Sequence, residues 1–209
     1  GRVLQTVGGA GGIGGAGNAE SDPSQSSINL TVGSPVSGSE NGGNILADNT
    51  ELSINTRGDN AYGLLAQSIG GSGGLGQVID PAQAVLGTPN SNASNPDGGT
   101  VTVNLGANAS IQTFGDGAHG VVLQSIAGGG GVAGFSSEAP PISVTPGFTT
   151  YNGNGNANPV HFTLPIGAQI QTQGDAAHAV VLQSIGDGGG IVSNPDGTRY
   201  FGSSNSSGS

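Results

Sequence analysis

Residues 115–126 read GDGAHGVVLQSI, and this pattern decides the fold because the chain repeats it. The same pattern returns as GDNAYGLLAQSI at 58–69 and as GDAAHAVVLQSI at 174–185, while a partial copy, VLQTV, lies at 3–7. One glutamine in each copy marks the period, and successive glutamines stand 62, 57 and 59 positions apart. These residues are Gln5, Gln67, Gln124 and Gln183. A repeat of this length indicates a stacked, quasi-one-dimensional protein.

Two shorter segments precede each full copy and are predicted to be β-strands. The first alternates apolar and polar residues with period two, as half-buried strands do. Its members are 28–32, 101–105 and 160–164. The second ends just before the Gly-Asp of each copy, and its members are 53–56, 110–113 and 169–172. The apolar run inside each copy predicts a third strand, because consecutive apolar residues are typical of strands covered on both faces.

The fold class follows from how such units bury apolar surface. One three-strand unit cannot cover its own apolar face, whereas stacked units can, because every strand pairs with its equivalent in the next unit. Helix is not expected, since glycine fills 43 of 209 positions and interrupts any helical period. We therefore predict an all-β protein, a right-handed parallel β-helix or β-solenoid with about one three-strand turn per repeat. The glycine-rich stretch and variable insert after each Gln-Ser-Ile are predicted to be a long loop; a degenerate second turn is the alternative.

The repeats divide the chain into units of a single β-solenoid segment, which we predict to span 1–202. We expect a partial repeat and three full repeats, followed by the start of a further unit. Their predicted boundaries are 1–27, about 28–85, 86–145 and 146–193, and 194–202. Residues 203–209 are rich in serine and glycine and are predicted to be a flexible tail.

The composition excludes several classes of function. Three arginines, no lysine and 13 acidic residues leave a formal net charge of −10, whereas affinity for nucleic acid comes from clustered Lys and Arg. The same deficit argues against an anionic membrane surface, and no apolar run approaches the ~18 residues that span a bilayer. The chain has no cysteine, so no disulfide holds it together. We therefore expect neither nucleic-acid binding nor membrane insertion.

Residues 58–74, GDNAYGLLAQSIGGSGG, and 115–131, GDGAHGVVLQSIAGGGG, resemble repeats in the passenger regions of large Gram-negative autotransporters. The resemblance implies a secreted β-helix at the bacterial cell surface, with a role in adhesion, aggregation, biofilm formation or host contact. The partners it implies are further copies of the chain, neighbouring cells, a host surface or glycans. The inserts, roughly 8–27, 70–100 and 127–159, are the expected contact surfaces because they differ between units and are expected to project.

The repeated glutamines predict a structural ladder. If each period is one turn, these side chains stack about 4.8 Å apart, and their amides hydrogen-bond along the column as in cross-β ladders. The hydroxyl residues that follow the glutamines form a neighbouring column. These are Thr6, Ser68, Ser125 and Ser184. We expect the two columns to stabilise the fold rather than to bind a ligand.

A Gly-Asp pair stands at the same predicted corner of every full unit. The pairs are Gly58-Asp59, Gly115-Asp116 and Gly174-Asp175. We expect each aspartate to form the turn and to cap its own backbone. A column of carboxylates that binds calcium is the alternative, and otherwise we expect no cofactor. Arg57 completes an Arg-Gly-Asp tripeptide, but Phe114 and Gln173 occupy the equivalent positions, so we interpret the arginine as incidental.

His119 and His178 occupy equivalent positions, three residues after Asp116 and Asp175. Two histidines with two carboxylates are a candidate zinc site. The first copy has Tyr62 at this position, however, and this argues against a shared ligand role. We therefore expect half-exposed corner histidines and no metal.

No arrangement of residues indicates catalysis. The chain has no cysteine, and no serine stands on a recognisable nucleophile elbow. Polysaccharide lyases and hydrolases built on a β-helix are the rival class, but a hydrolase needs two neighbouring carboxylates, and the acids here repeat once per period or scatter through the inserts. We therefore expect a non-catalytic extracellular structural or adhesive segment. A self-assembling matrix or filament subunit is the alternative.

Overall fold

The computed structural model describes residues 1–9, 11–16, 29–32, 40–71, 73–78, 83–86, 96–135, 155–186, 188–193 and 199–202. Every regular element among these residues is a β-strand, which confirms the all-β prediction. The same residues contain no helix of the length and apolarity needed to cross a membrane.

Three parallel sheets are formed by the predicted strand types. The central sheet has the order β1 (Arg2–Val7), β6 (Leu64–Ile69), β11 (Val121–Ile126) and β15 (Val180–Ile185). The side sheet consists of β5 (Ser53–Thr56), β10 (Ser110–Thr113) and β14 (Gln169–Thr172). The outer sheet consists of β4 (Ile45–Thr50), β9 (Val101–Leu105) and β13 (Val160–Thr163). In each of these sheets a strand lies parallel to its equivalent from the next repeat.

Two further sheets lie mostly in segments that we predicted to be loops, although one of their strands, Asn29–Val32, falls in the predicted strand 28–32. The glycine sheet contains β2 (Gly11–Ala16), β7 (Gly73–Val78), β12 (Gly130–Phe135) and β16 (Gly189–Ser193), again paired as equivalents. A small sheet pairs β3 (Asn29–Val32) with β8 (Gln83–Leu86). The prediction of a long glycine-rich loop is therefore wrong for these residues. Periodicity did not reveal the strands, because glycine replaces the apolar residues that would show an alternation.

Glycine is required where neighbouring strands of the glycine sheet approach one another. Gly130 and Gly131 have φ values of +136° and +137°, which residues with a side chain rarely adopt. A Cβ atom on Gly130 would overlap the carbonyl oxygen of Gly189, and one on Gly131 would overlap that of Gly74. A run of glycine is thus compatible with a strand here, although in sequence it resembles a flexible turn.

Two predicted segments also differ from the structure. We expected 28–32 to begin a full unit, but the outer-sheet strand of that repeat is β4, where a register shift between Ala47 and Thr50 breaks the alternation that would identify it. We expected a further unit to start at 194–202. Its described residues form β17 (Arg199–Gly202), which pairs antiparallel with β16 instead of extending the outer sheet. The predicted tail, 203–209, lies outside the described residues.

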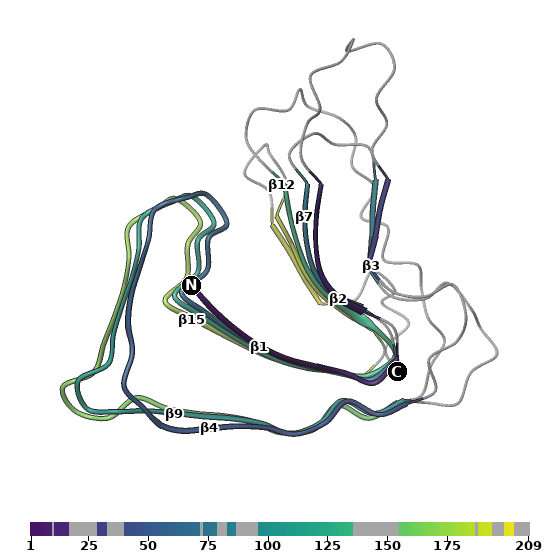
Figure 1. The fold of residues 1–209 in the computed structure, drawn as a ribbon, viewed down its shortest axis with the longest axis horizontal. Coiled ribbons are helices and arrows are strands. Elements are labelled where there is room, and N and C mark those ends of the chain that lie inside the picture. The colour runs from purple at the N-terminus through teal and green to yellow at the C-terminus, as the bar shows by residue number, and fades with distance from the viewer. Residues whose placement is uncertain are drawn as a thin grey trace, which may run out of the picture.

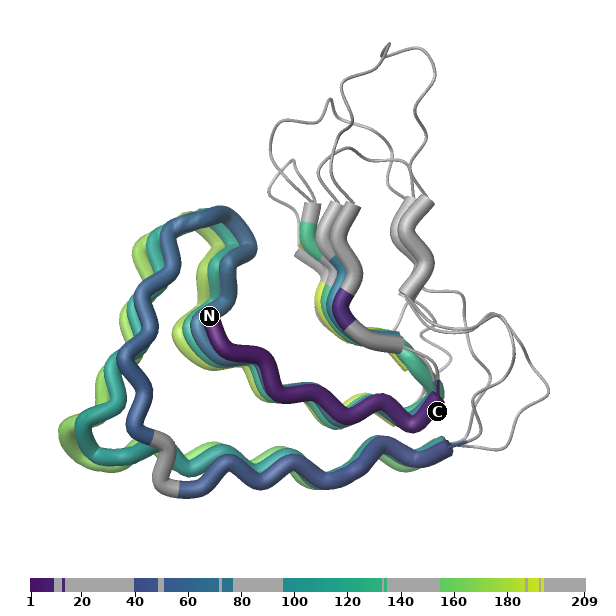
Figure 2. The backbone as a smooth tube through the Cα atoms, viewed as in Figure 1, coloured from purple at the N-terminus to yellow at the C-terminus, as the bar shows by residue number. Residues whose placement is uncertain are grey.

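The central sheet is covered on both faces. Seen along the direction in which the repeats succeed one another, equivalent strands overlie each other (Figures 1 and 2). The outer, side and central sheets enclose one core, which includes Val101, Ile111 and Leu123. A second core between the central and glycine sheets includes Val122 and Val132. Strands β6 and β11 are buried at all six residues, which explains their uninterrupted apolar sequence.

Candidate functional site

The four repeated glutamines form one column in the central sheet, aligned residue by residue. Gln5 Nε2 donates to Gln67 Oε1 at 2.9 Å, and Gln67 Nε2 donates to Gln124 Oε1 at 2.7 Å. Gln124 Nε2 donates in turn to Gln183 Oε1 at 2.5 Å. Gln183 Nε2 then reaches the carbonyl oxygen of Gly190 at 3.4 Å, which places the column against the glycine sheet. Gln67 and Gln124 are fully buried, so this ladder satisfies polar groups inside an apolar interior.

The hydroxyl column joins the central sheet to the segments that lead into the outer sheet. Ser68 Oγ donates to the carbonyl oxygen of Gly43 at 2.8 Å and accepts from the backbone nitrogen of Gly99 at 2.7 Å. One repeat further on, Ser125 Oγ accepts from the backbone nitrogen of Asn158 at 2.9 Å. The remaining members follow the same pattern. Thr6 Oγ1 donates to the carbonyl oxygen of Gly43 at 2.6 Å, and Ser184 Oγ donates to the carbonyl oxygen of Asn158 at 3.2 Å.

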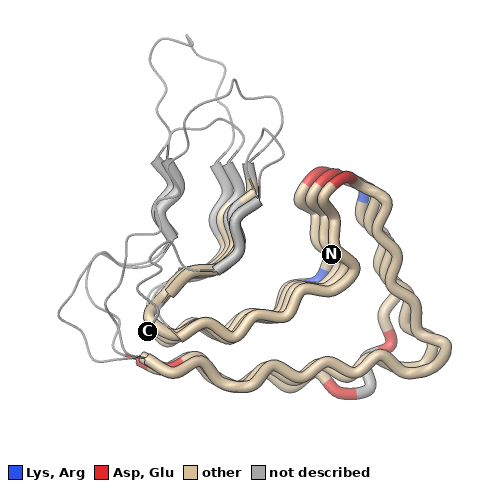
Figure 3. Tube along the Cα trace, turned by 180° about the vertical axis from the view of Figure 1, so that it is seen from behind, with Lys and Arg blue, Asp and Glu red and all other residues tan. Residues whose placement is uncertain are grey.

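The Gly-Asp corners between the side and central sheets form an exposed column. The backbone nitrogen of Asp116 donates to Asp59 Oδ1 at 3.0 Å, and that of Asp175 donates to Asp116 Oδ1 at 2.8 Å. The carboxylates of Asp59 and Asp116 therefore cap the backbone of the next repeat, whereas we expected each aspartate to cap its own. Figure 3 shows the acidic positions, in red, beside one another at this corner. A Cβ atom on Gly115 or Gly174 would overlap a backbone carbonyl oxygen of the preceding repeat, so the corner requires glycine.

The residue after each corner aspartate has a positive φ. The φ values are 54° for Asn60, 65° for Gly117 and 52° for Ala176. Glycine adopts this left-handed conformation freely and asparagine tolerates it, whereas alanine adopts it at a cost in free energy. The third corner is therefore more strained than the second.

A threonine side chain forms a hydrogen bond across each corner. The sequence pattern did not lead us to predict this contact. In all three repeats its Oγ1 donates to the carbonyl oxygen of an alanine five residues later. The pairs are Thr56 with Ala61 at 2.6 Å, Thr113 with Ala118 at 2.5 Å, and Thr172 with Ala177 at 3.3 Å. The signal is visible in the sequence, where this threonine and this alanine recur at the same positions of every full copy.

Tyr62, His119 and His178 form a column of stacked rings. The ring centroids of Tyr62 and His119 lie 5.4 Å apart with an interplanar angle of 13°, and those of His119 and His178 lie 5.2 Å apart at 17°. The backbone nitrogen of His178 donates to His119 Nδ1 at 3.0 Å, so this ring nitrogen is an acceptor. We expected half-exposed histidines, but His119 is fully buried while His178 is exposed.

The structure places the candidate metal ligands in these columns. The Asp116 carboxylate accepts from the backbone nitrogen of Asp175, and His119 and His178 stack on one another. Over the described ranges, no three His, Cys, Asp or Glu side chains come together as metal ligands. The zinc and calcium alternatives therefore gain no support from the geometry.

The arginine and aspartate side chains of the Arg-Gly-Asp tripeptide contact the next repeat. The guanidinium carbon of Arg57 lies 6.0 Å from the ring centroid of Phe114, a cation–π arrangement. Asp59 accepts the backbone hydrogen bond of the neighbouring corner. This geometry is consistent with a role in stacking.

The ends of two predicted contact inserts pack into the repeats. The backbone nitrogen of Asp97 donates to Asn41 Oδ1 at 2.8 Å, and Asp97 Oδ1 accepts from the backbone nitrogen of Asn156 at 2.7 Å. Pro96 and Gly98 are buried. The prediction that the inserts project is therefore wrong for these residues, because they form one more column that links successive repeats. Much of each insert lies outside the described residues.

Comparison with known proteins identifies no relative of this chain. A scan against protein-family models, a search of the curated proteins and a search of the solved structures each found no match. The geometry of the columns is therefore the basis for assigning a function. The glutamine, aspartate and ring columns share one property, because their side chains contact the next repeat.

Proposed function

We propose that this chain is a non-catalytic structural segment of a secreted bacterial surface protein, a right-handed parallel β-solenoid that holds variable inserts in place. The observation that carries the proposal is the glutamine column, in which the same side chain of four repeats is joined by three successive hydrogen bonds. Side chains used in this way join repeats and are not available to a substrate. The right hand is the one that parallel strands connected within one sheet adopt in almost all proteins.

The net charge and the resemblance of the repeats to autotransporter passenger repeats support the surface location. The formal net charge of −10 favours solubility and disfavours binding to nucleic acid or to an anionic membrane. The resemblance of 58–74 and 115–131 to autotransporter passenger repeats suggests export and a role in adhesion or aggregation. The inserts, which differ between repeats, are the segments that would make the contacts.

Surface display tests this proposal. The chain is anchored on non-adherent bacteria, and adherence to epithelial cells, binding to glycan arrays and cell–cell aggregation are measured. We expect a gain in at least one of them, and we expect its loss when residues 136–154 are replaced by a short Gly-Ser linker. A matched variant with the linker at 87–95 shows which insert carries the contact. The circular dichroism spectrum and melting of both variants should match those of the unmodified chain.

Two results would contradict the proposal. One is a displayed chain that changes neither adherence, glycan binding nor aggregation. The other is release of reducing or unsaturated sugar ends from a polysaccharide panel, which would identify a β-helix enzyme.

Self-assembly into filaments is a second candidate, because β1 and β15 lie at opposite edges of the central sheet and each pairs on one side only. Such edges invite pairing with another chain. One observation weighs against simple head-to-tail stacking, because β17 already occupies the edge of β16 in the glycine sheet. Long fibres in negative-stain microscopy would favour the second candidate, and a monomer in light scattering would favour the first.

A further inference from the structure

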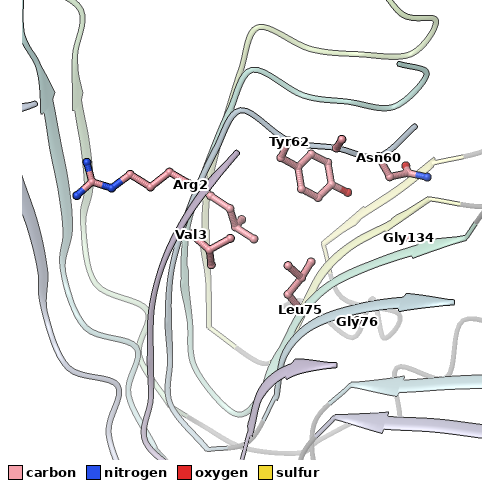
Figure 4. A pocket seen from close by; sticks show the side chains of 9 residues that line it. Arg2, Val3, Asn60, Tyr62, Leu75, Gly76 and Gly134 are labelled. Carbon is pink, nitrogen blue, oxygen red and sulfur yellow. The ribbon is translucent and has the colours of Figure 1, made fainter. Parts of the chain in front are cut away.

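The interior of the repeat stack and its outer surface differ in chemistry. Between the central and glycine sheets, apolar side chains, among them Leu65 and Leu75, line a space beside Tyr62 (Figure 4). The outward positions of the side sheet are polar instead, and they recur in every full repeat. We call the six outward residues of this sheet the side-sheet face. They are Ser53, Asn55, Ser110, Gln112, Gln169 and Gln171.

The side-sheet face is open to solvent and carries no charge. In β10, Ile111 and Thr113 are fully buried, whereas Ser110 and Gln112 are half-buried, and the outward residues of β5 and β14 are exposed. Figure 2 shows these three strands at the margin of the molecule, and no other described segment lies over their outer side. The face consists of hydroxyl and carboxamide groups, so it forms hydrogen bonds without ionising.

The amides on this face have hydrogen-bonding capacity to spare. Asn55 Nδ2 donates to Gln112 Oε1 at 3.4 Å, and Gln112 Nε2 donates to Gln171 Oε1 at 3.5 Å, which are long hydrogen bonds. A carboxamide offers two N–H donors and two oxygen lone pairs. Even with both of these bonds formed, Gln112 keeps one N–H and one lone pair for a partner. Hydroxyl groups suit such an array, because each of them both donates and accepts.

One neighbour of the face supplies an apolar surface, and another repels anions. The backbone nitrogen of Phe114 donates to the carbonyl oxygen of Thr56, so the ladder continues one residue beyond β10 and places Phe114 on the same side as Gln112. The half-buried ring of Phe114 offers an apolar surface to the C–H groups of a sugar. The exposed aspartates of the Gly-Asp corners follow next along the chain (Figure 3), and their charge disfavours an anionic polymer.

We propose that the side-sheet face binds an uncharged polysaccharide, laid along the stack so that successive sugar units meet successive repeats. Adjacent strands lie about 4.8 Å apart, and a β-linked glucan presents hydroxyl groups at a similar spacing. A single sugar unit contacts one repeat, whereas a polymer engages several repeats at once and gains affinity from each. This inference goes beyond the proposed function, because it assigns a contact to the scaffold and not to the inserts.

The first experiment is cosedimentation of the purified whole chain with cellulose particles. Carboxymethyl-cellulose particles are the matched probe, since they have the same glucan backbone with added carboxylates. The chain should bind cellulose in a saturable manner, and it should bind the carboxymethyl form at least about fivefold more weakly at low salt, because like charges repel. This difference should shrink in about 1 M sodium chloride, which screens the charges.

Matched variants locate the contact on the side sheet. Gln112→Ala should weaken binding to cellulose at least about threefold, the effect of losing one hydrogen bond. Asn104→Ala removes a half-buried amide from the outer sheet and should leave binding within about 1.5-fold, since this residue lies on another face. Phe114→Leu keeps an apolar side chain without the ring and should weaken binding about threefold. Replacing residues 136–154 by a Gly-Ser linker should leave binding to cellulose unchanged.

Four results would overturn the inference. One is the absence of saturable binding to cellulose, and another is an equal loss of binding in Gln112→Ala and Asn104→Ala. Loss of binding in the 136–154 linker variant would assign the contact to an insert, which agrees with the proposed function but not with a binding scaffold. A dimer in light scattering that Gln112→Ala converts into a monomer would show that the face pairs with a second copy of the chain.

Discussion

Two columns of amide side chains run along the repeats, one buried and one exposed. In the buried glutamine column the hydrogen bonds measure 2.5–2.9 Å between nitrogen and oxygen. In the exposed column on the side sheet, Asn55 Nδ2 donates to Gln112 Oε1 at 3.4 Å, and Gln112 Nε2 donates to Gln171 Oε1 at 3.5 Å. Both columns consist of amide side chains with the same period, but water competes mainly for the exposed amides. We infer that the buried column holds the repeats in register and that the exposed column contributes little.

The two columns differ in their contribution to stability because of what it costs to break a hydrogen bond, rather than because of how strong the bond is when formed. A typical hydrogen bond adds about 0.5–1.5 kcal/mol to stability, whereas a buried group left without a partner costs about 1–3 kcal/mol. Gln67 and Gln124 are both fully buried, so no water can replace Gln124 as the partner of Gln67. A side-sheet amide that loses its neighbour is solvated instead.

The largest effect is expected for Gln124→Ala, which should lower the free energy of unfolding by about 3 kcal/mol. The substitution leaves Gln67 Nε2 and Gln183 Oε1 without their partner and opens a cavity between the central and glycine sheets. Gln112→Ala in the exposed column is the matched control, and its effect should stay within about 0.5 kcal/mol. Urea unfolding followed by circular dichroism measures both, and equal losses would show that burial does not separate the two columns.

The second prediction removes the buried column as a whole. Gln124→Met alone should cost about 2 kcal/mol, because it leaves a donor and an acceptor unpaired at nearly unchanged volume. Replacing all four column glutamines by methionine should cost less than that single change, since donors and acceptors then disappear together. Urea unfolding of the single and quadruple variants measures the two losses in the free energy of unfolding. A quadruple loss near four times the single loss would mean that packing, and not hydrogen bonding, accounts for the column.

The third prediction extends the comparison to the corner threonines. Thr113 and the alanine whose carbonyl oxygen it reaches are fully buried, whereas Thr172 lies in the half-buried terminal strand at a longer distance of 3.3 Å. Thr113→Val should therefore cost about 1.5 kcal/mol and Thr172→Val about 0.5 kcal/mol. Thermal unfolding of the two isosteric variants measures the difference. A larger loss at Thr172 would reverse the inferred order.

The smallest effect, and the only gain, is expected at an exposed corner. Ala176 has a φ of 52°, so Ala176→Gly should stabilise the chain by about 1 kcal/mol by removing the strain of a left-handed alanine. Ala177→Gly, one residue further on, should instead destabilise it by about 0.5–1 kcal/mol. The melting temperatures of the two variants should move in opposite directions. A decrease in both would show that Ala176 does not have a positive φ in solution.

The sequence predicted those features in which the same type of side chain recurs at the same position of each repeat. The spacing of Gln67, Gln124 and Gln183 matches the register in which the central strands pair. The strands of the glycine sheet escaped prediction, because Gly130 and Gly131 carry no apolar side chain whose alternation would indicate a strand. Strand β4 was missed because its register shift interrupts period two. The exposure of His119 was misjudged, since the sequence does not tell which corner lies inside the stack.

What the sequence determined by itself is the period, the strands of the central and side sheets, and the residues that share a column. These depend on local side-chain chemistry, which repeats along the chain. Only the tertiary structure decided which columns are buried, because burial depends on the glycine sheet that covers one face of the central sheet. It also decided that the carboxylates of Asp59 and Asp116 cap the next repeat and that the rings of Tyr62, His119 and His178 stack. Such contacts join residues about sixty positions apart, and their geometry depends on how the sheets pack.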